Sequence, residues 1–570
     1  MQCPLLRLLA LAPFLRYLEL VAAARPPAPY VMTWSDKSYG PDGPWQAVSV
    51  GIGSASQKIA LYPGGTWESR ILVKSLCANT SLSSVCYADD AGLFNTEESN
   101  TWDNTSINIP PKADTWSDFE LGAADAVPVK ARVERAMDTI DLGGDSVYDV
   151  DLLAVSQAYQ TYPGGQNYPL EVGVLSLGCP EFNQTFTRGD GVSINATFIN
   201  SHVFTAKMAS SYSFGMHIGS APLRIPGSLM LGGYDGNRIV GETSAQPYSG
   251  GKFPIKLLDV GIGVASGGSP WNYFNKTGLL EKGNSSLHQG ITVMASPGDP
   301  YLYLPKSSCD AITSELPTTY DSDLGLYLWN TSDPRYEQII KSPSYLSFEF
   351  NKNSLNSANI TIKVPFALLN LTLEAPLVKN PTLYFPCMGT DGTPALGRAF
   401  LQAAFMAANW SWGGRIGNWI LAQAPGPNYF TTNKLTNIME KDMTIPGTTN
   451  NWEETWANYW TPIPITSSSA TPVPTPSSKS DDSNDNGIST GAVVGIAVGC
   501  AAAGVLLGVL AWVFITRRRR RNALEQGQMA HVYPGIRVKH AEGVYELNGR
   551  RGPYELAIRH PPYELAGPDH

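Results

Sequence analysis

The sequence of 570 residues is poor in charge, in histidine and in metal-binding motifs. Charged residues make up 16% of the chain, which is low for a helical, charge-rich cytosolic protein. Only seven histidines occur, four of them beyond residue 530, and neither a His-Glu-x-x-His nor a Cys-x-x-Cys motif is present. We therefore expect no catalytic zinc site and no other metal or cofactor.

Basic residues are scarce outside the C-terminal end. The formal net charge is −9, yet residues 517–570 carry ten Lys and Arg against six Asp and Glu. The rest of the chain is therefore strongly acidic. Because phosphate recognition needs a basic face, we expect no nucleic-acid partner.

Both ends carry segments typical of targeting signals. Residues 1–24 predict a secretory signal peptide, with Arg7, an apolar run and a small-residue cleavage site. Gly491 to Ile515 is 25 residues without a charge, long enough to cross a bilayer, and five arginines follow at once. These features predict a single-pass type I protein of the plasma membrane or another secretory-pathway membrane, with a cytoplasmic tail at 516–570.

Possible glycosylation sites and cysteines agree with this topology. Two cysteines fall in the targeting segments, Cys3 and Cys500, and the other five are consistent with two disulfides and one free thiol. Ten Asn-x-Ser/Thr sequons lie before the membrane segment and none lies in the tail. They are Asn79, Asn104, Asn183, Asn195, Asn275, Asn284, Asn330, Asn359, Asn370 and Asn409.

Between the targeting segments the chain is rich in turns, with 54 Gly and 43 Pro overall. Short β-rich runs alternate with Gly, Pro, Asn and Ser, as at 45–53, 57–62, 345–350, 359–364 and 418–423. The best helical pattern is Gly397 to Ala408. The composition predicts an all-β ectodomain.

The end of the ectodomain is less clear from composition. Residues 466–490 are rich in Ser, Thr, Pro and Asp, which predicts a solvated stalk. Residues 426–465, rich in Trp and Asn, fit either an extension of the domain or an ordered stalk. We place the boundaries of the ectodomain at 25–465.

A weak internal repeat is visible in the ectodomain. A β-run ending in a glycine turn occurs at Lys58–Gly65 and again at Ile291–Gly298. Each is followed later by a hydrophobic-Gly element, Val174–Gly178 in the first half and Pro394–Gly397 in the second. The two copies predict a two-lobed β protein.

A further set of segments resembles the pepsin-like aspartic peptidases of family A1, particularly membrane-anchored fungal members. The best match is Gly227–Gly241, where a strand ends in a Gly-Gly turn. The other matching segments keep the family's order: Phe94–Trp102, Asp138–Gly144, Gly173–Gly178, Leu302–Pro305 and Ala395–Phe400. The resemblance implies a bilobal pepsin-like fold with lobes at about 40–225 and 226–425, and disulfides Cys77–Cys86 and Cys309–Cys387.

The catalytic motifs of that family are missing. Its members need two carboxylates that share a proton and a water, each at the start of an Asp-Thr/Ser-Gly turn. The chain contains no Asp-Thr-Gly or Asp-Ser-Gly, and Tyr62 and Ser296 stand at the two expected positions. The family's flap also carries a tyrosine, whereas no tyrosine occurs between Tyr87 and Tyr148. Asp299, near the second position, is more simply read as a solvated turn residue.

Two functions follow from this pattern. The first is a non-proteolytic binding or sensing module, whose groove between the lobes would hold an extracellular peptide or glycan or would be closed by Tyr62. The second is a membrane-tethered aspartic-type endopeptidase with unorthodox catalytic residues. The loss of both acids favours the first, because neither Tyr62 nor Ser296 is an ionised base at neutral or acid pH.

The tail repeats the triplet Tyr-Glu-Leu three times, at Tyr545, Tyr554 and Tyr563. The tail is short and biased in composition, so we expect it to be disordered. Regular spacing of the triplet in such a tail predicts multivalent docking to a cytosolic adaptor, with a drifted low-complexity repeat as the alternative. Tyr533 begins a Tyr-x-x-hydrophobic pattern typical of a sorting signal.

Overall fold

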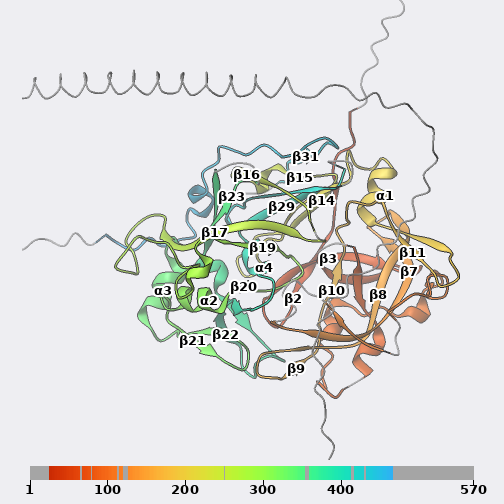
Figure 1. Cartoon of the computed structure of the whole chain (residues 1–570), viewed down its shortest axis with the longest axis horizontal. Coiled ribbons are helices and arrows are strands. Elements are labelled where there is room, and N and C mark those ends of the chain that lie inside the picture. Colours follow the sequence, from red (N-terminus) through yellow and green to blue (C-terminus); the bar gives the residue numbers. More distant parts are fainter. Residues whose placement is uncertain are drawn as a thin grey trace, which may run out of the picture. The chain divides into compact units, whose positions relative to one another are not determined.

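The protein is described from a computed structural model (Figure 1). The description covers residues 25–465 apart from residues 65–66, 79, 112–114, 120–125, 250, 354–357, 412–415 and 429–431. The predicted signal peptide, stalk, membrane segment and tail lie outside this range, as do Tyr533, Tyr545, Tyr554 and Tyr563. No helix within the described residues is long and apolar enough to cross a membrane.

The described chain is mostly β, as predicted, and each half builds a large sheet. In Figure 1 the first half, in red to orange, lies to one side and the green second half to the other. The nine-stranded sheet of the first half contains β2 (Trp34–Tyr39), β3 (Trp45–Ile52), β4 (Gln57–Pro63), β10 (Gly173–Leu175), β5 (Ser69–Leu72), β8 (Ser146–Thr161), β7 (Val129–Asp141) and β6 (Trp116–Phe119), with β9 (Asn167–Tyr168) beside β8. The eight-stranded sheet of the second half contains β24 (Asn359–Pro365), β23 (Ser344–Asn351), β17 (Phe253–Val264), β19 (Ile291–Ala295), β28 (Ala395–Leu396), β20 (Leu302–Leu304) and β27 (Cys387–Gly389), with β18 (Asn275–Lys276) beside β17.

A third, six-stranded sheet takes strands from both halves. Its order is β1 (Tyr30–Val31), β14 (Ser228–Leu231), β13 (Ser213–His217), β29 (Ala404–Asn409), β30 (Asn418–Gln423) and β16 (Val240–Pro247). The expected lobe boundary at 225/226 falls between β13 and β14, which are hydrogen-bonded neighbours. The two halves therefore share this sheet.

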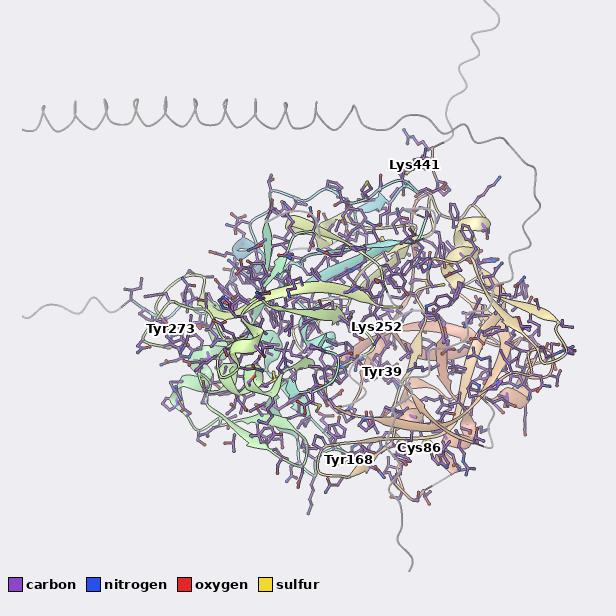
Figure 2. The ribbon with its side chains drawn as sticks, in the orientation of Figure 1. Tyr39, Cys86, Tyr168, Lys252, Tyr273 and Lys441 are labelled. Atoms are coloured by element: carbon purple, nitrogen blue, oxygen red, sulfur yellow. A yellow bond between two sulfur atoms is a disulfide. The ribbon has the colours of Figure 1, made fainter. Side chains whose placement is uncertain are left out.

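Smaller elements complete the fold. A four-stranded sheet contains β21 (Thr318–Asp321), β22 (Leu326–Trp329), β26 (Thr382–Phe385) and β25 (Leu371–Leu373), and two-stranded sheets pair β11 (Asn183–Thr187) with β12 (Ser193–Thr197) and β15 (Gly233–Asp235) with β31 (Leu435–Asn437). The α-helices are short: α1 (Ile199–Thr205), α2 (Lys306–Thr313), α3 (Pro334–Lys341) and α4 (Arg398–Leu401). The largest hydrophobic core draws side chains from both halves, among them Tyr39 (Figure 2).

The internal repeat appears as a shared strand arrangement. In the first half β10 runs parallel to β4 and antiparallel to β5. In the second half β28 runs parallel to β19 and antiparallel to β20. A backbone contact closes each copy, from the Gly64 amide to the Leu175 carbonyl at 2.7 Å and from the Ser296 amide to the Leu396 carbonyl at 3.0 Å. It lies two residues after Tyr62 in the first copy and at Ser296 itself in the second, so the two closures are offset by two residues from the correspondence of Tyr62 with Ser296. The predicted two-copy pattern is confirmed at this level.

The prediction of a helix over residues 397–408 is wrong. Only Arg398–Leu401 is helical, and Ala404–Asn409 forms β29 in the six-stranded sheet. Every residue of β29 is buried, since strands pair on both of its edges and cores pack on both of its faces. A short apolar run of this kind fits a fully buried strand as well as it fits a helix.

Residues 426–465 belong to the domain. β31 pairs with β15, and a 3₁₀ helix, η9 (Glu453–Trp456), packs Trp452 and Trp456 into the main core. The Thr455 hydroxyl accepts from the Gly426 amide at 2.8 Å. The first of the two readings of this segment, an extension of the domain, is the one that the structure supports.

Candidate functional site

The candidate site lies where the ends of β4 and β19 meet. Tyr62, near the end of β4, is only 6% exposed, and its hydroxyl has no hydrogen-bond partner among the described residues. The guanidinium of Arg398 lies over the Tyr62 ring, 4.0 Å from the ring centre, and 5.1 Å from the ring centre of Trp45. A cation stacked on an aromatic face thus occupies the junction of the two halves.

Arg398 also hydrogen-bonds to the turn that follows β19 and begins at Ser296. It is the first residue of α4, directly after β28, and is 4% exposed. Its Nη1 donates to the carbonyl oxygens of Gly298 at 2.8 Å and Pro297 at 3.4 Å. Through this side chain the structure brings Tyr62 and the turn that begins at Ser296 together. The sequence placed Arg398 in a matching segment but gave it no role, because a buried cation has no motif of its own.

Asp299 is not the solvated turn residue that we expected. It is only 1% exposed, so the expectation is wrong. Its backbone carbonyl accepts from the Arg398 amide at 2.7 Å, and its own amide donates to the Ser296 carbonyl at 3.2 Å. The tight turn between β19 and β20 carries it inward beneath α4. It is not among the residues that line the cavity described next.

A small cavity opens beside Tyr62 between the two halves. Its volume is about 100 Å³, well below the roughly 300–1,000 Å³ of most small-molecule sites. The first half supplies most of its lining and the second half the rest. The polar residues of the lining are Asp42, Tyr62, Arg70, Gln160, Glu171 and Arg398. The cavity holds water-sized molecules, not a peptide.

Glu171 is the unusual acid of this cavity. Burial, followed by the negative charges of Asp42, Asp90 and Glu374, raises its pKa from 4.5 to about 8. Its Oε1 is buried and has no hydrogen-bond partner among the described residues. Sequence reasoning missed Glu171, because no motif surrounds it and only the fold brings it to the junction.

Burial also raises the pKa of Tyr62 well above its usual value, and the nearby cation Arg398 only partly offsets this. The Tyr62 phenol therefore stays protonated over the working pH range of any acid or neutral peptidase.

Direct hydrogen bonds tie the two halves together around the cavity. The hydroxyls of Tyr162 and Tyr301 lie 2.7 Å apart, and the Tyr384 hydroxyl donates to the Asp42 carbonyl at 2.6 Å. The Glu374 amide donates to the Pro41 carbonyl at 2.7 Å. These contacts between the halves favour a groove that is closed at Tyr62 over a groove that is open to a peptide or glycan.

Both disulfides implied by the family resemblance are present, Cys77–Cys86 and Cys309–Cys387. The fifth cysteine, Cys179, is fully buried, and burial raises the pKa of its thiol well above the usual value. Such a thiol is poorly nucleophilic. Two disulfides are consistent with a secreted or extracellular protein.

The predicted glycosylation sites differ in access. Asn183, Asn195, Asn275, Asn330 and Asn359 are exposed, Asn104, Asn284 and Asn370 are partly buried, and Asn79 lies outside the described residues. Asn409 is 0% exposed, and its amide donates to the carbonyls of Met439 and Asp442, both at 3.0 Å. The prediction of a glycan at Asn409 is therefore wrong, because a buried, hydrogen-bonded side-chain amide leaves no room for a sugar.

We expect peptide mass spectrometry after enzymatic deglycosylation in heavy-oxygen water to find Asn409 unmodified. The exposed Asn183 serves as the comparison within the same digest. A heavy-oxygen label at Asn409 would contradict the buried position of this side chain.

Comparison with known proteins finds no family model that matches the chain and no curated protein that matches it.

Proposed function

We propose that the chain is a single-pass membrane glycoprotein whose ectodomain has a bilobal pepsin-like fold and binds or senses a ligand without cleaving it. The observation that carries the proposal is the Arg398 guanidinium, buried on the ring of Tyr62 at the junction of the two copies of the strand repeat. The predicted motif positions place the catalytic acids of a peptidase at this junction.

The chemistry of proton sharing supports the proposal. Two carboxyls share one proton only where their negative charges are close and uncompensated. A guanidinium at the junction favours the ionised form of any nearby carboxyl, and Tyr62 and Ser296 supply no carboxyl at all. The two motif positions therefore give a water at this junction no pair of carboxyls of the kind that the peptidase reaction uses, and the carboxyls that do line the cavity, Asp42 and Glu171, stand at other positions.

The alternative is a peptidase with unorthodox catalytic groups. Asp42 and Glu171 both line the inter-lobe cavity, and the pKa of Glu171 is raised to about 8, as a general acid would require. A volume of about 100 Å³ argues against it, because a peptide must enter before any acid can act.

The proposed membrane anchor and the proposed role of the tail are supported by the sequence alone. We assign the membrane span to residues 491–515, the stalk to 466–490 and adaptor docking to the tyrosines of the tail. The proposed extracellular ligand is a peptide or a glycan.

We expect no cleavage when the purified full-length chain in detergent is incubated with a mixed peptide library from pH 3 to 7. An authentic aspartic peptidase in the same detergent is the positive control. The variant Tyr62→Asp/Ser296→Asp is expected to stay inactive, because Arg398 remains beside the new acids. Statine-sensitive cleavage by the unmodified chain that disappears in Glu171→Gln would establish the peptidase alternative.

A further inference from the structure

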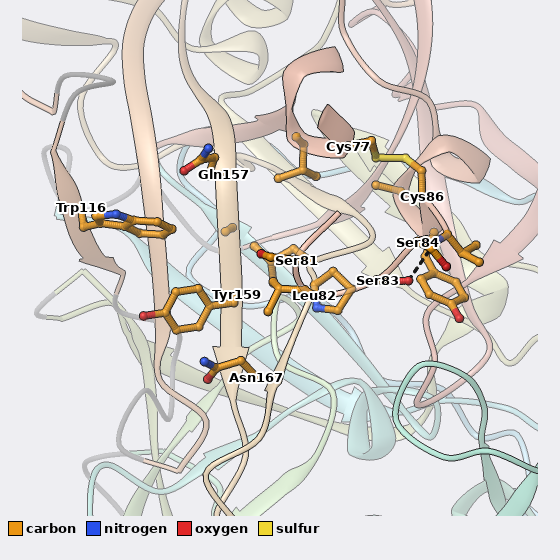
Figure 3. Close-up of a pocket in the computed structure, with 17 residues that line it drawn as sticks. Cys77, Ser81, Leu82, Ser83, Ser84, Cys86, Trp116, Gln157, Tyr159 and Asn167 are labelled. Carbon is orange, nitrogen blue, oxygen red and sulfur yellow. Dashed lines mark hydrogen bonds between the residues drawn. A yellow bond between two sulfur atoms is a disulfide. The ribbon is translucent and has the colours of Figure 1, made fainter. Parts of the chain in front are cut away.

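A second, larger cavity lies away from the junction, in the first half of the chain. Its volume is about 310 Å³, about three times that of the inter-lobe cavity and within the range of small-molecule sites. β6 and β8 form one wall and the residues 80–86, here called the disulfide loop, form the other. Figure 3 shows Trp116 and Tyr159 on one side and Ser83, Ser84 and Cys86 on the other.

The first wall is aromatic and solvent-accessible. Trp116 is 44% exposed, although tryptophan usually buries most of its ring. Its ring centre lies 5.4 Å from that of Tyr159, with the planes tilted by 56°, and the Arg132 guanidinium lies 5.3 Å from the Trp116 ring centre. Tyr159 and Arg132 thus pack against the indole, whose exposed part offers a ligand an apolar face.

Neutral hydrogen-bonding groups surround the aromatic face. The side-chain amide of Gln157 makes no hydrogen bond within the described residues. The Asn167 oxygen accepts from the Thr161 hydroxyl at 2.7 Å, which leaves the Asn167 nitrogen to donate elsewhere. Ser83 and Ser84 add hydroxyls on the opposite wall.

Charge is absent from this lining. None of the 17 residues that surround the cavity is Asp, Glu, Lys, Arg or His, although the ectodomain as a whole is acidic. The Arg132 guanidinium lies against the Trp116 ring but does not line the cavity, so a charged ligand would lose its hydration here without an ionic partner in the lining. The occupant that fits must be neutral, with an apolar face and several hydroxyls.

We infer that this cavity binds a neutral saccharide. A pyranose ring presents a C–H face that packs on an indole, and its equatorial hydroxyls both donate and accept, which suits amide and serine side chains at the rim. The Cys77–Cys86 disulfide cross-links the second wall, and such a constraint limits the entropy lost on binding. A short neutral peptide also has hydrogen-bonding groups, but it lacks the flat C–H face that the exposed Trp116 matches.

The inference rests on the proposed function only in that the chain binds a ligand. It assigns the ligand to a site of its own, so proteolysis at the junction and saccharide binding at this cavity are measured independently. Detection of peptide cleavage would overturn the proposed function. The saccharide site would still be tested separately, by titration of the chain with saccharides.

The test titrates the deglycosylated full-length chain in detergent with neutral oligosaccharides of glucose, N-acetylglucosamine and mannose, followed by tryptophan fluorescence and calorimetry. Oligosaccharides of galacturonate are the charged comparison, and a neutral tetrapeptide is the peptide comparison. We expect saturable binding of at least one neutral saccharide and none of the charged series.

Variants then locate the site. Trp116→Ala is expected to weaken saccharide binding by about tenfold or more, Trp116→Phe by less, and Gln157→Ala by several-fold. Tyr148→Ala is the matched control, because Tyr148 is an exposed aromatic residue, 61% exposed, that lies outside the cavity on β8, the strand that carries Gln157 and Tyr159. Thermal unfolding checks that each variant folds. The inference is wrong if no neutral saccharide binds, if Trp116→Ala and Tyr148→Ala bind equally, or if the tetrapeptide binds in place of the saccharides.

Discussion

Replacement of Arg135 by methionine is expected to reduce the free energy of unfolding of the ectodomain by about 3–5 kcal/mol at pH 7. Arg135, on β7, is 7% exposed and donates to Asp151 on β8 and to Glu68, at 2.5 Å in both contacts. Asp151 is 4% exposed. Without the guanidinium, Asp151 must either stay buried as an uncompensated charge or take up a proton that the unfolded chain does not hold at pH 7, and this cost is the main source of the loss.

The size of the loss should depend on pH. Burial raises the pKa of Asp151 to about 6, even though Arg135 lowers it. Without Arg135 the pKa of Asp151 is no longer lowered, so Asp151 in the variant keeps its proton to still higher pH. At pH 5 the acid is neutral in the folded variant, and the destabilisation should be smaller than at pH 7.

Urea-induced unfolding followed by intrinsic fluorescence, at pH 5 and at pH 7, measures both effects. Arg188→Met is the matched control, since Arg188 pairs with Asp190 in an exposed loop. Exposed ion pairs contribute little, so this variant should unfold close to the parent at both pH values. Equal effects of the two substitutions would contradict the role of the buried ion pair.

The sequence predicted those parts of the fold that depend on local pattern. Alternation of apolar and polar residues marks β23 correctly, because alternate side chains of this strand are buried. The glycine turns after β4 and β19 were found because the repeat places the same residue types at both. The pattern failed at Ala404–Asn409, where both faces of the strand are covered and no alternation remains.

The candidate site was only partly accessible from the sequence. Tyr62 and Ser296 could be located, because each keeps the place of a missing motif residue. Arg398 and Glu171 could not be assigned roles, since a lone arginine or glutamate has no signature and only tertiary packing brings them to the junction. The Trp116 cavity was missed for the same reason, as its walls are about 30 to 80 residues apart in the sequence.

Replacement of Glu171 by glutamine is expected to stabilise the protein at pH 7 to 8. The pKa of Glu171 is about 8 in the folded chain and 4.5 without the burial and the neighbouring charges. Between these values the folded state holds one more proton than the unfolded state, so the free energy of unfolding falls as pH rises. Glutamine stays neutral in both states, so the variant does not show this decrease in the free energy of unfolding with pH. The gain should be negligible at pH 4 and about 2–4 kcal/mol at pH 7 to 8.

Thermal and urea unfolding from pH 4 to 9 should therefore give curves for parent and Glu171→Gln that coincide at acid pH and separate steadily toward pH 8. Above pH 8 Glu171 is ionised in both states, so the separation should become constant. Glu97→Gln, at an exposed position of the same half, is the control and should follow the parent throughout. A variant that gains nothing at pH 8 would mean that Glu171 is ionised in the folded chain. The inter-lobe cavity would then carry a further negative charge beside Asp42, and the case for Glu171 as an acid in the peptidase alternative would be lost with it.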